Sequence, residues 1–168
     1  AQVSAPAVIT GNYIGTDASG LVARGNGSGI VAEVRNAVSP GFASSLDIGG
    51  FAPSARNLIA ASSNQSVGSG DGVLVRLLAP GVVARVIGNV VGVDAALAAA
   101  AGNAGWGLRV LHPRSDCSAS VEVRGNSVGG NRLGGLLLGA GAAASACSQR
   151  SPTRIAGNRF GLPGGLGN

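Results

Sequence analysis

The sequence predicts an all-β fold, a right-handed parallel β-helix of about four to five rungs in which residues 1–168 form a single domain. Three features predict it. They are a composition that favours short strands and turns, a Gly-Asn motif that recurs along the chain, and a glycine-led strand pattern that alternates with this motif. A solenoid accounts for all three, because each repeat covers the apolar face of the next repeat.

The composition is poor in large and in charged side chains. Of the 168 residues, 45% are hydrophobic and 30 are glycine, whereas 3% are aromatic and 11% are charged, against roughly 25% charged residues in an average globular chain. A helical bundle would need many Leu, Glu and Lys residues at helical spacing. Short strands rich in Val, Ile and Leu, joined by turns that contain glycine, fit this composition better.

The recurring motif reads apolar-x-Gly-Asn-x-apolar-Gly. Its four copies contain Asn12, Asn89, Asn126 and Asn158. A degenerate copy is assigned to residues 59–62. Glycine and asparagine both tolerate the left-handed backbone of a sharp bend, and an asparagine amide can bond to the asparagine one rung away. We therefore expect these four asparagines to form a structural ladder at one turn of the stack.

The second pattern is a glycine followed by a strand in which apolar residues alternate. It occurs at residues 29–34, 72–77, 107–111 and 135–138, so each rung is expected to hold two strands with a bend between them. Alternate residues of a strand point to opposite sides. The outward positions form a candidate interaction face, which contains Val31, Leu74, Arg76, Arg109, Leu111 and Leu137. An exposed aliphatic strip of this kind marks an interaction site, unless a long loop such as residues 35–56 covers it, and both alternatives stay open.

Two stretches carry a resemblance to a known family. Gly-Asn-Tyr-Ile-Gly-Thr-Asp-Ala-Ser-Gly, at residues 11–20, and Arg-Ile-Ala-Gly-Asn-Arg-Phe-Gly, at residues 154–161, resemble the repeats of right-handed parallel β-helix proteins of the pectate-lyase-like superfamily. The resemblance extends from Val8 to Gly161 and implies the fold. It does not select a function, because that superfamily includes lyases, glycosidases, adhesins, phage spikes and structural repeats.

Enzymes of that superfamily act on acidic polysaccharides with grouped carboxylates, with or without calcium. The seven carboxylates of this chain are dispersed. Asp17 and Asp94 occupy equivalent loop positions about 10 Å apart at a rung spacing of about 4.8 Å, and we expect both to cap turns. His112 precedes Arg114 and Asp116, which suggests a His-Arg-Asp cluster or, alternatively, an ordinary polar loop. The sequence thus predicts no catalytic residue, no metal site and no cofactor.

The charge pattern disfavours a nucleic-acid partner. All twelve basic residues are arginines, and the net charge is +5, but the arginines are scattered and no aromatic residues are interleaved with them. The longest uncharged apolar run near the end, residues 133–147, is too short to cross a bilayer, so no transmembrane segment is expected. The chain contains no methionine, even at position 1. We expect either that a leader was removed or that the chain is a segment of a longer protein.

The two cysteines, Cys117 and Cys147, follow successive strands and are expected to form a disulfide. Such a bond would place the protein in an oxidising compartment, such as the cell exterior, a periplasm or an organelle lumen. The alternative is a pair of buried free thiols.

The sequence favours a non-catalytic exported module with a structural, adhesive or assembly role. Its expected partners are other protein subunits or extracellular polysaccharide. The alternatives are a polysaccharide-active enzyme, either a lyase or a glycosidase, and a carbohydrate-binding module.

Overall fold

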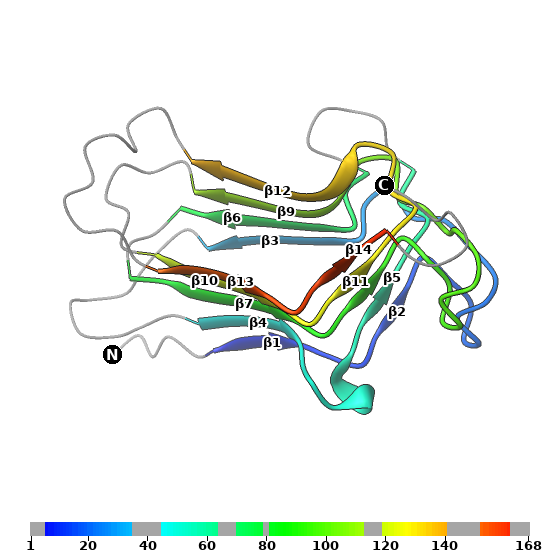
Figure 1. The fold of residues 1–168 in the computed structure, drawn as a ribbon, viewed down its shortest axis with the longest axis horizontal. Helices are drawn as coiled ribbons and strands as arrows, with labels where there is room; N and C mark the ends of the chain where they lie inside the picture. The colour runs from blue at the N-terminus through cyan, green and yellow to red at the C-terminus, as the bar shows by residue number, and fades with distance from the viewer. Residues whose placement is uncertain are drawn as a thin grey trace.

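Parallel strands in three sheets make up the protein (Figure 1). The computed structural model describes residues 6–34, 45–63, 70–78, 81–112, 119–140 and 152–161. The first sheet contains β1 (Ala7–Ile9), β4 (Ser45–Gly49), β7 (Val83–Ile87), β10 (Ser120–Arg124) and β13 (Thr153–Ala156). The second contains β2 (Tyr13–Ile14), β5 (Leu58–Ile59), β8 (Val90–Val91), β11 (Ser127–Val128) and β14 (Arg159–Phe160). The third contains β3 (Ile30–Val34), β6 (Val73–Leu77), β9 (Trp106–His112) and β12 (Gly134–Ala140).

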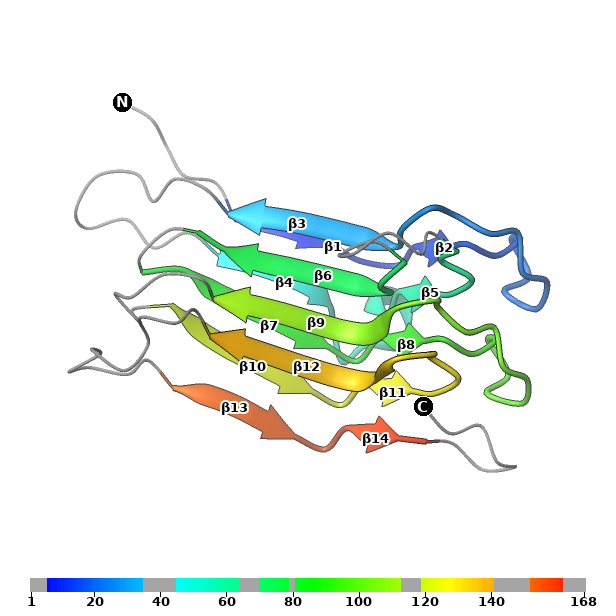
Figure 2. The same cartoon turned by 90° about the horizontal axis from the view of Figure 1, so that it is seen from above.

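The chain visits the three sheets in the same order on every pass, and each pass is here called a rung. Figure 2 shows the rungs stacked from β1, β2 and β3 at one end to β13 and β14 at the other. The all-β class and the parallel stacking were predicted, and the arrangement is consistent with a parallel β solenoid. The expectation of two strands per rung was wrong, because the residues before each Gly-Asn motif form a strand of their own in the first sheet.

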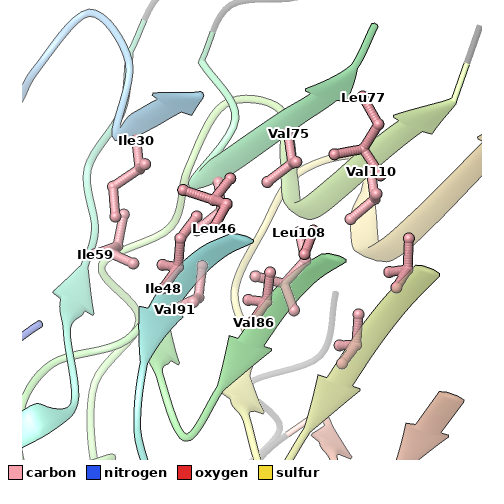
Figure 3. Packing of buried hydrophobic residues seen from close by; sticks show 14 of the residues in the cluster. Ile30, Leu46, Ile48, Ile59, Val75, Leu77, Val86, Val91, Leu108 and Val110 are labelled. Atoms are coloured by element: carbon pink, nitrogen blue, oxygen red, sulfur yellow. The ribbon is translucent and has the colours of Figure 1, made fainter. Parts of the chain in front are cut away.

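The core lies between the three sheets and is built from the side chains that point inward from their strands (Figure 3). Its largest fully buried side chains include Ile48, Ile59, Leu77, Leu108 and Val86. These branched aliphatic residues suit β-strands. In the third sheet the alternation of inward and outward residues follows the expected pattern, with Val73 opposite Leu108 and Val75 opposite Val110.

An asparagine ladder joins the rungs where the first sheet turns into the second. Its members are Asn12, Asn57, Asn89, Asn126 and Asn158. At each step the side-chain oxygen of one asparagine accepts from the backbone N–H and the side-chain amide of the asparagine in the preceding rung. For Asn126 and Asn89 these distances are 2.9 Å and 3.1 Å. The amide of each later asparagine also donates to a strand carbonyl of the preceding rung, as Asn126 does to Val86 at 2.9 Å.

The glycines before Asn12, Asn89, Asn126 and Asn158 all have a positive φ, and at Gly88 a close approach of the backbone also excludes a side chain. Gly88 has φ +67°, and a Cβ there would lie 2.2 Å from the carbonyl oxygen of Gly50. In the second rung Arg56 stands before Asn57, after the short 3-10 helix η1 (Pro53–Ala55). The degenerate copy assigned to residues 59–62 was therefore misplaced, since the ladder residue of this rung is Asn57.

A second set of polar contacts joins the rungs where the second sheet turns into the third. The Asn131 side-chain oxygen accepts from the Asn103 backbone N–H at 3.4 Å and amide at 2.7 Å, and Asn103 accepts from the Ser62 backbone N–H at 3.1 Å. Two hairpins, residues 16–25 and 93–102, project from this turn (Figure 1). They contact each other through a 3.0 Å bond from the Ala95 N–H to the Gly20 carbonyl.

The part of the chain that the structure describes contains no helix long and apolar enough to span a membrane.

Candidate interaction face

The six residues of the predicted interaction face lie on the outer side of the third sheet, in two columns that cross its strands. The first column contains Val31, Leu74, Arg109 and Leu137, and the second contains Glu33, Arg76, Leu111 and Gly139. Register fixes these columns, because parallel pairing places each residue beside its partner one rung away.

The aliphatic residues of the face differ sharply in exposure. Val31, at the first-rung edge, is 53% exposed, whereas Leu74, beside it in the next rung, is 1% exposed although it lies outside the core cluster. Leu111 and Leu137 are half-buried. The continuous exposed strip expected from the sequence is therefore interrupted at Leu74.

Residues 35–56 were expected as a possible cover for this face. Within that range, residues 45–49 form β4 in the first sheet, and residues 53–55 form η1 beside the turn between the first and second sheets. These segments are thus part of the stack itself. Residues 35–44 lie outside the described residues.

Ion pairs hold the charged residues of the face. An Arg76 guanidinium nitrogen lies 2.7 Å from a carboxylate oxygen of Glu33, its partner in the preceding rung. Asp71 is nearly buried, and its two oxygens contact the Trp106 backbone N–H at 2.8 Å and Arg109 at 3.4 Å. The Nε of Arg109 is buried and has no hydrogen-bond partner within the described part of the chain. The outer face of the third sheet is consequently a mixture of aliphatic side chains and ion-paired charges.

A second charged feature, which the sequence reasoning did not anticipate, lies on the outer side of the first sheet. Val8, Asp47, Arg85, Glu122 and Arg154 stand in one column across β1, β4, β7, β10 and β13. From Asp47 onward the charges alternate in sign. Arg85 lies 3.0 Å from Asp47 and 3.9 Å from Glu122, and Arg124 lies 3.1 Å from Glu122.

This charged column had a signal in the sequence. Three strands of the first sheet place one charged residue between two apolar residues, namely Leu-Asp-Ile at 46–48, Ala-Arg-Val at 84–86 and Val-Glu-Val at 121–123. A period of two with one charged outward residue is the pattern of a half-buried strand. Aligning the Gly-Asn motifs would have brought Arg85, Glu122 and Arg154 together, whereas Asp47 lies in the rung that lacks the Gly-Asn pair.

The two aspartates in the hairpins bind their own loops. Asp17 accepts from the Ser19 hydroxyl at 2.7 Å and from the Val22 N–H at 3.3 Å, and Asp94 accepts from the Ala98 N–H at 2.8 Å. The hydrogen bond from Ser19 is the main cause that lowers the pKa of Asp17 below its usual value of 3.8. Both carboxylates therefore serve as caps of tight turns.

The remaining site expectations fall partly outside the described residues. His112 ends β9, and its Nε2 is buried without a hydrogen-bond partner, while Arg114 and Asp116 lie outside. So do Cys117 and Cys147, whose disulfide stays a prediction. Among the described residues no group of three or more His, Cys, Asp and Glu side chains is placed to hold a metal ion.

Comparison with family models, curated proteins and solved structures found no match for this chain.

Proposed function

We propose that this chain is a right-handed parallel β-helix similar to the pectate-lyase-like superfamily, and that it works without catalysis as an exported structural, adhesive or assembly module. Three parallel sheets visited in a fixed order support the fold. The asparagine ladder and the buried core keep the strands in register. The ion-paired outer faces leave the surface to bind a partner, which supports this role.

One observation carries the non-catalytic assignment. Glycosidases need two carboxyl groups with substrate or water between them, about 5 to 9.5 Å apart. On the outer side of the first sheet, Asp47 and Glu122 share a face, and the guanidinium of Arg85 stands between them and contacts both. The space that a reacting sugar would need is thus occupied by a side chain of the protein.

The other described carboxylates also have local partners. Glu33 pairs with Arg76, Asp71 binds Trp106 and Arg109, and the two hairpin aspartates bind their loops. Carboxylates engaged in this way hold strands and turns in place. A polysaccharide lyase or hydrolase would instead need acids that are open to the substrate.

The test is incubation of the purified chain with polygalacturonate and alginate, with and without calcium. Unsaturated products would be followed by ultraviolet absorbance, and new reducing ends by a colorimetric assay. We expect no products above those of a heat-denatured control. Turnover that Asp47→Asn or Glu122→Gln abolishes, while Glu33→Gln on the other sheet leaves it intact, would establish the enzymatic alternative and overturn the proposal.

Export is part of the same proposal and rests on the predicted disulfide between Cys117 and Cys147. Structural disulfides persist in oxidising compartments and are rare in the cytosol. Partners expected for such a module are other protein subunits or extracellular polysaccharide, and the outer face of the third sheet is the surface proposed to contact them.

A further inference from the structure

The asparagine ladder has a direction, and this direction gives the stack two different ends. Inside the stack every ladder asparagine reaches back to the preceding rung. The oxygen of Asn89 accepts from the backbone N–H and amide of Asn57 at 3.3 Å and 2.9 Å, and its amide donates to the Ile48 carbonyl at 2.9 Å. Each rung therefore offers donors forward and an acceptor backward.

At the last rung the ladder donor that points away from the stack has no acceptor among the described residues. Asn158 accepts from the Asn126 N–H at 3.0 Å and amide at 2.8 Å, and it donates to the Val123 carbonyl at 2.9 Å. Its own backbone N–H donates to none of the residues that the structure describes. The edges of β13 and β14 that face away from β10 and β11 pair with no described strand.

At the first rung the ladder acceptor that points away from the stack has no donor among the described residues. Asn12 donates through its backbone N–H and its amide to the Asn57 oxygen, both at 3.0 Å. The Asn12 side-chain oxygen accepts from no described residue. In every later rung the corresponding asparagine oxygen receives two hydrogen bonds. The first rung therefore carries an unused ladder acceptor, and the last rung carries an unused ladder donor.

The apolar columns end in the same complementary way. Ile155 and Phe160 continue the columns of Val123 and Val128, which are fully buried, yet they are 47% and 44% exposed. At the opposite end, Ile9 and Ile14 occupy the corresponding columns, and both are only partly buried. Figure 2 shows these two ends facing in opposite directions along the stack.

We infer that the last rung of one copy docks onto the first rung of a second copy of this chain. β13 pairs with β1, β14 pairs with β2, and Asn158 donates to the Asn12 oxygen, which continues two sheets and the ladder across the join. Because the contact is head-to-tail, it builds linear chains of copies rather than closed dimers. The inference rests on the proposed assembly role and names its partner.

The join is weaker than a step inside the stack. Among the described residues the third sheet ends one rung earlier, at β12, so the β12 edge of one copy and the β3 edge of the next are not brought into direct pairing. Association of this kind depends on protein concentration.

The test is sedimentation velocity of the full chain over a range of concentrations, with variants that block one end each. Ile155→Lys places a charge at the last rung, and Ala7→Lys places one at the exposed inward position of β1, as natural edge strands do to prevent pairing. Val8→Gln is the matched control, because Val8 is 60% exposed and points outward from the same strand. The control is uncharged, since Val8 shares its column with Arg154 and a lysine there would repel that residue across the join. Circular dichroism and the melting temperature check that each variant folds.

The mean mass of the wild type and of Val8→Gln should rise with concentration, and each end-blocked variant alone should stay monomeric. An equimolar mixture of the two blocked variants should form a two-chain species and stop there, because only one productive pair of ends remains. Asn12→Ala should weaken wild-type association about tenfold, since it removes the ladder acceptor, without changing the melting temperature.

A wild type that stays monomeric at every concentration would overturn the inference, and so would blocked variants that associate as the wild type does or a mixture that forms no two-chain species. These outcomes leave the non-catalytic role standing. Glycan turnover would do the reverse, because it would overturn the non-catalytic role without affecting the association of the ends.

Discussion

Replacing one ladder asparagine should cost stability according to its place in the stack. Asn126 is fully buried in the middle of the ladder, where its oxygen holds the Asn89 N–H and its amide holds the Val86 carbonyl. Asn126→Ala would leave both of these backbone groups without that partner inside the stack. An unsatisfied buried polar group costs about 1–3 kcal/mol, so we expect the free energy of unfolding to fall by about 3 kcal/mol.

The matched control is Asn12→Ala at the exposed first rung. The Asn12 side chain donates to the Thr10 carbonyl and the Asn57 oxygen, and the latter keeps its bond from the Asn12 backbone N–H. Exposed substitutions of this kind usually change stability by less than about 0.5 kcal/mol. The effect should therefore differ severalfold between two chemically identical substitutions.

Urea unfolding, followed by circular dichroism and by the fluorescence of the single tryptophan, Trp106, measures both values. At about 2–4 °C per kcal/mol for a domain of this size, the melting temperature of Asn126→Ala should fall by roughly 6–12 °C. Equal unfolding midpoints for the two variants would show that burial of the ladder does not govern its strength, and would refute this reasoning.

Three further predictions concern the loops. Leu97 has φ +57° at the tip of its hairpin, where the equivalent residue of the other hairpin is Gly20 at φ +72°. Leu97→Gly should stabilise the fold by about 1 kcal/mol in urea unfolding, whereas Gly20→Leu should destabilise it. Cys117 and Cys147 should resist alkylation in the unfolded, unreduced protein, and two labelled thiols by intact mass would exclude the disulfide. The pKa of Asp17 is lowered on folding, so its ionised carboxylate contributes to the stability of the fold above pH 3.8. This stability is lost as the pH falls through the folded pKa. A chemical shift titration that places the Asp17 pKa at or above 3.8 would contradict this.

The parts of the fold that the sequence predicts are those in which local pattern and long-range pairing coincide. The strands that follow residues 29, 72, 107 and 135 carry apolar residues at their inward positions, and these inward residues lie beside one another across the sheet as predicted. The Gly-Asn motifs fall at one turn, because a left-handed glycine and an amide that reaches one rung back are needed together at that point.

The first sheet escaped notice because its strands run directly into the Gly-Asn motif. β7 ends at Ile87, immediately before Gly88, so the strand was counted as the flank of the motif. In the second rung the excursion through η1 separates β4 from Asn57 and removes the glycine, which hides both the strand and the ladder residue. An insertion at a turn conceals a repeat without disturbing the pairing of the strands on either side.

Exposure of outward residues was the least predictable feature. Leu58 points outward from the second sheet, in register with Tyr13 and Val90, yet it is 3% exposed because the hairpin of the first rung folds over it. A Cβ at Gly20 of that hairpin would lie 2.7 Å from the Leu58 side chain. Strand period fixes the side on which a residue points, but coverage by a loop of another rung depends on the whole fold.

The charged column of the first sheet has more value for register than for stability. Arg85 and Asp47 are 41% and 30% exposed, and such surface pairs contribute roughly 0.2–1 kcal/mol each. A slip of β7 by one residue, however, would turn Arg85 into the core and Val86 into water, because side chains alternate. Burying an unpaired guanidinium costs far more than the pair contributes. The charges therefore exclude wrong registers. The asparagine ladder makes the same contact at every step and gives the stack its direction, so the two ends stay distinct.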